Sequence, residues 1–353
     1  MCICVHASVA HICVLLCVRR SCTLMYVEMS RISESDKSLW NDDFPKIVVC
    51  GLRKSGKSSI LRVLFNKLSP HEASYIDSTL VPTFLPLSVN PMLKVRVAEI
   101  PGCWSWDESA ELDEIFFSRC QSLVLVIDSA DEQVHASVFS LCKRVIARAI
   151  RVNSRIPIHL LLHKIDANYK FDPDSVQCEN NKAVFVQSIV SRINQDVGLL
   201  TNNARIDLSA HCTSIFDSSI NEAFSKIVQR PLLANGKIEQ IIDTIVTSCR
   251  LEKAFLFDIV SKINFADSGA GSSLLNDMLE VVVDMCSIYA PAPACDTKTE
   301  CSISLSNGEI LFMRLIEKHL AFVAIVKAEN FDKTFLMNHN INAFKDALML
   351  IVE

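Results

Sequence analysis

Residues 46–60, KIVVCGLRKSGKSSI, decide the fold of this chain. Gly51, four further residues and then Gly56-Lys57-Ser58 complete the pattern of a P-loop. The β-branched run before the loop predicts a buried strand, and a helix is expected to follow it. Glycines let the backbone curl, so its N–H groups and the N-terminus of the following helix can hold anionic oxygens. The stretch therefore predicts a phosphate-binding loop between a strand and a helix.

Individual side chains of this loop have expected roles. Lys57 would reach the β- and γ-phosphates of a nucleotide, and Ser58 would ligate Mg²⁺. The residues expected to contact phosphate are Gly51, Arg53, Lys54, Ser55, Gly56, Lys57, Ser58, Ser59 and, from a later loop, Gly102.

A second motif, HKID at 163–166, indicates which base is bound. It follows a predicted buried strand, at the sheet edge where ligands bind in α/β proteins. Guanine needs a carboxylate that accepts hydrogen bonds from its N1–H and 2-amino groups, and adenine offers no such pair of donors. Asp166 would read the base and Lys164 would lie along it. His163 replaces the asparagine of the usual NKxD box.

The stretch EIPG at 99–102 resembles the DxxG box of GTPases. The Gly102 N–H would sense the γ-phosphate. The aspartate of that box normally holds a magnesium-bound water, but this chain has Glu99, which is one methylene longer, so the metal geometry stays open. Cys103 stands where many GTPases carry the glutamine that orients the attacking water. Both departures predict inefficient hydrolysis.

The stretch HCTSIFD at 211–217 ends another predicted strand. Ser214 and Ile215 could close over the base through backbone contacts. A plain helix cap is the alternative interpretation of these residues.

Apolar runs and helical stripes alternate along the first part of the chain. The expected strands are 46–50, 93–99, 122–128, 156–163 and 204–211, and a helical stripe carries Val134, Val138, Leu141, Val145 and Ala149. A further helix is expected over 218–229. Such alternation predicts an α/β fold, a mainly parallel sheet wrapped by helices.

Pro231 marks a change to a second, α+β domain. Its expected elements are a helix over 238–250, a strand over 254–260, a helix over 272–289, a hairpin over 302–315 that turns at Asn307-Gly308, and a final helix with Ile341, Phe344, Leu348 and Ile351 on one face. This domain has no cluster of catalytic residue types, which favours a packing or partner-binding role.

Composition narrows the class of protein. With 353 residues, the chain is long enough for about two domains. A net charge of -5 and a pI near 6.0 argue against a general binder of nucleic acid or acidic membranes. The 15 cysteines are scattered through apolar runs, which is typical of reduced thiols in a cytosolic protein.

Residues 1–44 are expected to be an N-terminal extension, either disordered or an artefact of the gene model. Its first part is apolar and then turns basic, the reverse of a secretory signal. A signal anchor, a short amphipathic anchor and translated sequence upstream of a true start at Met29 are the open interpretations, and we favour the last. With no myristoylated glycine or prenylated cysteine, no direct membrane anchor is expected.

Four stretches together resemble the Rag GTPases, in particular their C/D branch: GLRKSGKSSI, HKID, TSIFDSSINEAFSKIVQ and LEKAFLFDIVSKI. The last two are the most specific, because a general P-loop protein has no reason to carry them. The resemblance covers about 46–353. In that family the HKxD form is usual, which accounts for His163. By its spacing, Thr79 matches the magnesium-ligating threonine of switch I, whereas 82–91 does not look like the family.

The resemblance implies a small-GTPase G domain over 45–230 and a roadblock-type dimerisation domain over 231–353. It implies GTP or GDP as ligand, Mg²⁺ held by Ser58, Thr79 and Glu99, and a heterodimer with an A/B-type Rag. Rag dimers dock on a scaffold complex at the lysosomal surface and report amino-acid supply to the TOR kinase complex. In the C/D chain the GDP form is the active one. The protein would thus be cytoplasmic and recruited to the lysosome through partners, with slow hydrolysis that depends on a GTPase-activating protein.

Two rival functions remain at this point. A P-loop ATPase or nucleotide kinase would make Asp166 irrelevant and would let adenine nucleotides compete. A nucleotide-binding scaffold subunit with little or no hydrolysis is favoured by Glu99 and Cys103.

Overall fold

The computed structural model describes residues 44–88, 94–104, 106, 110–130, 136–172, 177–198, 206–232, 237–268, 300–317, 319–331 and 334–352. The predictions for the N-terminal extension and for the helix over 272–289 lie outside these residues. No helix in the described ranges combines the length and apolar character needed to cross a bilayer.

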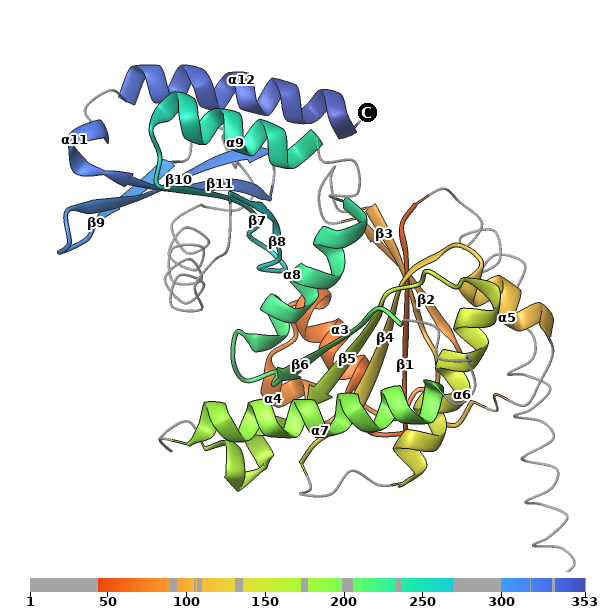
Figure 1. The fold of residues 1–353 in the computed structure, drawn as a ribbon. Coiled ribbons are helices and arrows are strands. Elements are labelled where there is room, and N and C mark those ends of the chain that lie inside the picture. Colours follow the sequence, from red (N-terminus) through yellow and green to blue (C-terminus); the bar gives the residue numbers. More distant parts are fainter. Residues whose placement is uncertain are drawn as a thin grey trace, which may run out of the picture.

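The first part of the chain forms a six-stranded sheet in the order β2-β3-β1-β4-β5-β6 (Figure 1). The strands are β1 (Lys46–Gly51), β2 (Thr83–Ser88), β3 (Lys94–Glu99), β4 (Cys120–Asp128), β5 (Ile158–His163) and β6 (Leu208–Thr213). Only β2 runs antiparallel to its neighbour, and all other pairs are parallel. Every residue of β1 and β5 is buried, as central strands covered on both faces require. The predicted sheet wrapped by helices is confirmed.

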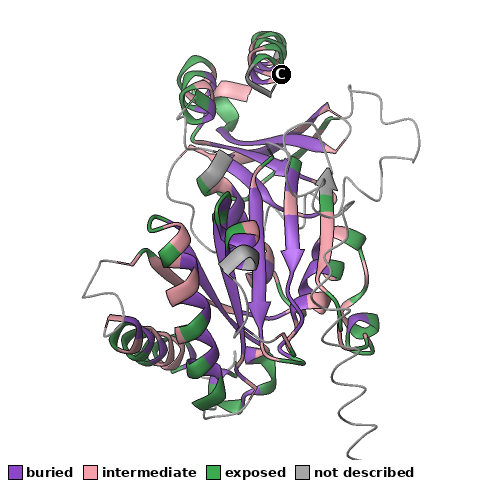
Figure 2. Ribbon diagram, turned by 90° about the vertical axis from the view of Figure 1, so that its right-hand side faces the viewer, coloured by how far each residue is buried: buried purple, intermediate pink, exposed green. Residues whose placement is uncertain are grey.

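Helices cover both faces of this sheet. They are α3 (Lys57–Asn66), α4 (Pro70–Ala73), α5 (Ala110–Phe117), α6 (Ala136–Val152), α7 (Cys178–Gly198) and α8 (Ser219–Leu232), with short 3₁₀ turns η1 (Ile165–Ala167) and η2 (Tyr169–Phe171). Alternate β1 residues point to opposite faces. Ile47 and Val49 pack with α3 and α8, whereas Val48 and Cys50 pack with α5, α6 and α7. The buried layers between sheet and helices are visible in Figure 2.

Two sequence-predicted boundaries shift in the structure. The strand expected over 204–211 begins at Leu208 and ends at Thr213. β6 pairs with β5 residue by residue, with Leu208 opposite Ile158 and Thr213 opposite His163. β5 itself starts at Ile158, because the preceding Pro157 has no N–H to give to a sheet ladder. Helix α8 also continues past Pro231, where the sequence predicts a change of domain. Pro231 lies in the last turn of the helix, and because proline has no N–H, one helical hydrogen bond is missing there.

The second part forms a five-stranded antiparallel sheet in the order β8-β7-β11-β10-β9. Its strands are β7 (Lys253–Asp258), β8 (Asn264–Asp267), β9 (Glu300–Ser304), β10 (Glu309–Glu317) and β11 (Leu320–Lys327). The hairpin predicted at Asn307-Gly308 is confirmed: β9 and β10 pair antiparallel, and Gly308 has a φ of 84°. Strand β8 is not among the sequence-based expectations.

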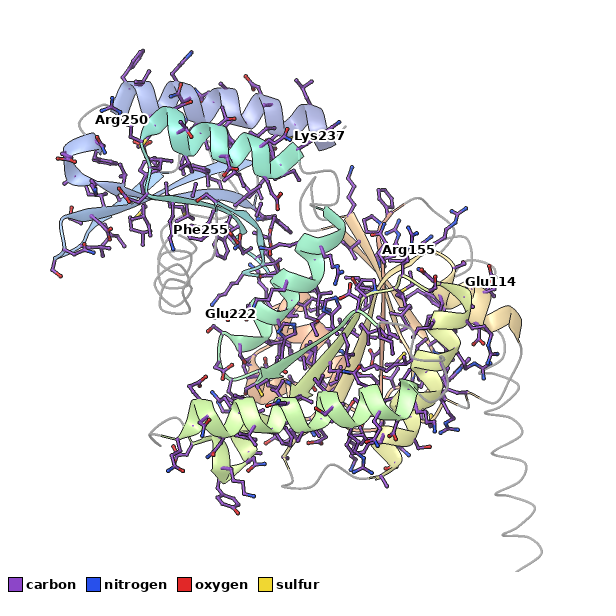
Figure 3. All side chains as sticks on the ribbon, in the orientation of Figure 1. Glu114, Arg155, Glu222, Lys237, Arg250 and Phe255 are labelled. Atoms are coloured by element: carbon purple, nitrogen blue, oxygen red, sulfur yellow. The ribbon has the colours of Figure 1, made fainter. Side chains whose placement is uncertain are left out.

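Helices α9 (Lys237–Cys249) and α12 (Thr334–Val352) lie side by side over one face of this sheet, and α11 (Ala328–Phe331) follows β11 (Figure 1). Figure 3 labels Lys237 and Arg250 near the opposite ends of α9. Ile341, Phe344 and Leu348 are buried, so the apolar face predicted for the last helix is present at these positions.

Helix α8 joins the two sheets. Asn221 Nδ2 donates a hydrogen bond of 2.9 Å to the Ser261 carbonyl, and the Asn264 N–H donates one of 2.9 Å to Ser225 Oγ. Gln229 Nε2 also donates to the Asn264 carbonyl at 3.0 Å. Apolar residues of α8 belong to the same buried cluster as residues of both sheets. The helix that follows the predicted base-binding loop therefore also packs on the second domain.

Candidate nucleotide-binding site

A pocket of about 570 Å³ opens at the carboxyl ends of the central strands. This is the edge at which open α/β sheets bind ligands. It is lined by Arg53, Lys54, Gly56, Lys57, Ser58, Ser59, Ala73, Ser74, Tyr75, Ile76, Asp77, Ser78, Thr79, Glu99, Gly102, His163, Lys164, Asp166, Ala167, Ile215 and Phe216. All sequence-predicted site residues line it except Gly51, Ser55 and Ser214. The fold thus brings together segments that lie far apart in the sequence.

The P-loop backbone requires glycine at Gly56. Its φ is 101°, in the left-handed region, and a Cβ built there would lie 2.5 Å from Cδ2 of His163. The HKID histidine therefore packs directly on the phosphate loop. Any side chain at position 56 would be strained and would also push these two loops apart.

Lys57 is held at the floor of the loop. Its Nζ donates hydrogen bonds of 3.0 Å to the Gly51 carbonyl and 2.9 Å to the Leu52 carbonyl. Burial lowers the pKa of Lys57, and the negative charge of Glu99 opposes that shift. An ammonium group has three N–H donors, so one remains for an anionic oxygen in the pocket.

Three oxygens cluster beside Lys57. Ser58 Oγ lies 2.7 Å from Thr79 Oγ1 and donates a hydrogen bond of 2.5 Å to Glu99 Oε1. Thr79 Oγ1 also donates to Glu99 Oε1, at 3.1 Å. Mg²⁺ prefers hard oxygen ligands, so a carboxylate and two hydroxyls at these separations fit that cation. The structure brings together all three residues that the sequence assigns to the metal.

The base-recognition loops are tied to each other. Asp166 Oδ1 accepts a hydrogen bond of 2.5 Å from Ser214 Oγ. His163 Nδ1 lies 3.1 Å from Thr213 Oγ1, and burial lowers the pKa of His163 to about 4, so its ring is neutral near pH 7. Ser214 thus lies behind Asp166 and orients its carboxylate.

Lys164 links the base loop to the phosphate loop. Its backbone φ is 63°, and its Nζ donates hydrogen bonds of 2.5 Å to Asp128 Oδ2 and 2.7 Å to the Lys54 carbonyl. The side chain therefore crosses from one loop to the other along the pocket wall.

Gly102 touches the P-loop. A Cβ built on it would lie 2.2 Å from the backbone nitrogen of Arg53, so no other residue fits at this position without a backbone shift. Cys103, the next residue, is exposed and does not line the pocket. The segment that would sense a γ-phosphate thus begins in contact with the loop that would hold it.

Phe216 lines the pocket, although no sequence motif pointed to it. Phe216 is 51% exposed, and its ring lies edge-on to His71 with centroids 5.6 Å apart. His71 belongs to α4, which starts with a capping box between Ser69 and Glu72. The S-x-x-E spacing of that box was a signal from which α4 could have been predicted.

Comparison with known proteins assigns the family. The model "Gtr1/RagA G protein conserved region" matches residues 46–286. Ras-related GTP-binding protein D of Mus musculus is 32% identical over 88% of this chain and 68% of its own length. Ras-related GTP-binding protein C of Homo sapiens is 30% identical over 88% of this chain and 77% of its own length. GTP-binding protein gtr2 of Schizosaccharomyces pombe is 30% identical over 87% of this chain and 97% of its own length.

A solved structure of the Arl6 BBS3 small GTPase from Trypanosoma brucei, with a bound nucleotide analogue, is 16% identical and covers 52% of this chain and 94% of its own. Its TM-score of 0.31 is low, so the family is shown by the family model and by the relatives that are at least 30% identical. This chain belongs to the Gtr1/RagA family of G proteins.

Proposed function

We propose that this protein is a Rag-type guanine-nucleotide switch that binds GTP and GDP. One observation carries the proposal: the Asp166 carboxylate, oriented by Ser214, lines the same pocket as the P-loop lysine Lys57. A carboxylate in that place can accept hydrogen bonds from guanine N1–H and its 2-amino group, while Lys57 meets the phosphates. Its relatives in mouse, human and fission yeast are named as GTP-binding proteins.

When bound, Mg²⁺ would neutralise negative charge on the phosphates of the nucleotide. Ser58, Thr79 and Glu99 would hold it, and the backbone N–H of Gly102 would sense the γ-phosphate. Loss of the γ-phosphate would release Thr79 and Gly102, which is how such switches change shape. Because Cys103 replaces the water-orienting glutamine, hydrolysis is slow and an activating protein supplies what this chain lacks.

The second domain acts as the dimerising module. Its antiparallel sheet with α9 and α12 on one face suits a roadblock-type domain that pairs with an A/B-type Rag. We assign the G domain to 45–230 and this module to 231–353. The heterodimer would sit in the cytoplasm and be recruited to a scaffold complex on the lysosome. There it would relay amino-acid sufficiency to the TOR kinase complex, with the GDP form of this chain active.

A second candidate is a nucleotide-binding scaffold subunit that does not hydrolyse GTP. The thiol of Cys103 favours it, because a thiol lacks the amide with which glutamine orients an attacking water. In that case the partner chain would carry the nucleotide cycle.

The test is nucleotide binding and single-turnover hydrolysis by the purified heterodimer with an A/B-type partner, using GTP, GDP and ATP. Guanine-specific binding with slow turnover supports the switch. Guanine binding without turnover, even with an activating protein, supports the scaffold. Competition by ATP equal to that by GTP would refute both.

A further inference from the structure

We propose that the Glu99 carboxylate is a direct ligand of the nucleotide-associated divalent cation, and does not hold it through a water molecule. The inference rests on the proposed function, because it concerns the cation that accompanies bound nucleotide. It assigns a defined chemical role to the residue at which this chain departs from the DxxG pattern.

The separations of the three oxygens support direct binding. Ser58 Oγ, Thr79 Oγ1 and Glu99 Oε1 form a triangle with sides of 2.7, 2.5 and 3.1 Å. Mg²⁺ binds oxygens at about 2.0–2.1 Å in octahedral geometry, so neighbouring ligand oxygens lie about 2.9 Å apart. The triangle therefore has the size of one face of a magnesium octahedron.

When the cation is bound, Glu99 Oε1 would take the place of a water. Ser58 and Thr79 would supply two of the three ligand oxygens of that octahedral face. The third ligand oxygen must then lie about 2.9 Å from each of the two hydroxyls. A carboxylate oxygen that bound the cation through a water would lie beyond this position and leave it to the water. Glu99 Oε1 instead lies within hydrogen-bond distance of both hydroxyls, which is where that water would otherwise lie.

The backbone of Glu99 cannot retreat to make room for a water. It is the last residue of β3, paired with Val49 on β1 and Thr83 on β2, and it is only 4% exposed. The extra methylene relative to aspartate must therefore project the carboxylate forward into the oxygen cluster.

Direct binding has a measurable consequence. Each protein ligand that enters the inner coordination sphere of a six-coordinate cation displaces one water. A Glu99→Asp variant shortens the side chain by one methylene and should readmit that water. Wild-type protein should thus hold one water fewer on the cation than the variant.

The experiment uses the heterodimer loaded with Mn²⁺ and a non-hydrolysable GTP analogue, the state in which Thr79 stays at the cation. Mn²⁺ is chosen because it replaces Mg²⁺ at oxygen sites and is paramagnetic. Line broadening of its EPR spectrum in ¹⁷O-enriched water counts the bound waters. We expect one fewer in wild type than in Glu99→Asp. Glu114→Asp, an equivalent change at an exposed residue on α5, is the matched control and should leave the count unchanged (Figure 3).

A second measurement needs no variant that could misfold. In wild-type protein labelled with ¹³C at the glutamate carboxylates, a directly bound Glu99 gives a resolved ¹³C hyperfine coupling to Mn²⁺. A carboxylate behind a water gives only the weak coupling of a distant nucleus. Equal water counts in wild type and Glu99→Asp, or the absence of the strong ¹³C coupling, would overturn direct binding while leaving the switch intact. Failure to bind GDP at all, seen by fluorescence, would instead refute the proposed function together with this inference.

Discussion

Ser214 Oγ donates a hydrogen bond of 2.5 Å to Asp166 Oδ1, and the Phe216 N–H donates one of 3.0 Å back to Ser214 Oγ. The loop after β6 thus fixes the carboxylate proposed to read the base. Base recognition is therefore a property of two loops held together, one after β5 and one after β6.

The first prediction concerns base choice. Asp166→Asn converts one acceptor into a donor, so GDP affinity should fall at least about a hundred-fold, since hydrogen bonds to charged groups contribute roughly 1.5–3 kcal/mol each. Xanthine nucleotides, which present an acceptor in place of the 2-amino group, should then bind better than guanine nucleotides. Competition against a fluorescent nucleotide measures both. Unchanged preference for guanine would remove Asp166 from the site.

Ser214→Ala is the companion variant for that experiment. It frees the Asp166 carboxylate without changing its charge, so GDP should bind more weakly but guanine should still be preferred over xanthine. A switch of base in Ser214→Ala would show that the hydroxyl itself contacts the base.

The second prediction concerns the phosphate loop. Lys57→Ala removes the buried ammonium that would meet the phosphates, and binding of GTP and GDP should become undetectable by titration calorimetry. Lys54→Ala, at an exposed neighbour in the same loop, is the control for a general loss of positive charge and should bind far better. Full retention of affinity in Lys57→Ala would contradict the P-loop assignment.

Much of this site could be predicted from the sequence because its motifs are local. The P-loop and HKID spacings each place their residues on one turn of chain after a buried strand. By contrast, the contact of His163 with Gly56 and that of Phe216 with His71 depend on how distant loops meet, which a linear pattern does not encode.

Element boundaries were predicted less well for the same reason. The start of β6 is set by its pairing with β5, and α8 extends past Pro231 while it packs against the second domain. Tertiary contacts of this kind override local breaker signals. The buried runs of β1 and β5 were predictable, because a continuous apolar stretch is itself the cause of burial on both faces.

The third prediction concerns Gly102. Gly102→Ala places a methyl group against the Arg53 backbone, so this segment must move away from the P-loop. GDP affinity should change little, since the phosphate loop itself is intact. The affinity advantage of GTP over GDP conferred by the γ-phosphate contact should be lost, as stopped-flow dissociation of labelled nucleotides would measure. A retained difference between GTP and GDP would argue that Gly102 is not the γ-phosphate sensor.

The fourth prediction concerns acid stability. Burial lowers the pKa values of His159, His163 and His211 from 6.5 to about 4. The unfolded chain restores the ordinary value, so it binds more protons than the folded protein between these two limits. The contribution of these histidines to the free energy of unfolding should therefore be fully present above pH 6.5. It should fall as the pH drops toward 4.

Urea unfolding of the protein from about pH 7.5 down to about pH 4.5 tests this dependence. His159 and His211 stack at a centroid distance of 6.3 Å, and neither Nε2 has a hydrogen-bond partner within the described residues. Replacing both by asparagine should flatten the pH profile even if it lowers stability overall. A profile that keeps its full slope in that double variant would assign the acid sensitivity to other groups.

The fifth prediction addresses whether this chain hydrolyses GTP. Cys103→Gln restores an amide that can orient water, and it should raise the single-turnover rate by roughly a hundred-fold, the lower end for a positioned catalytic group. Cys103→Ala should leave the slow rate unchanged, because a thiol lacks the amide donor and acceptor with which glutamine orients water. A gain in Cys103→Gln alone would mean that the active site is complete except for this residue. No turnover in any of the three proteins, even with an activating protein, would place the block elsewhere, with Glu99 and its hold on the cation the first residue to exchange. The chain would then act as a fixed arm of its dimer, and GDP–GTP exchange on it would be the only way to change its state.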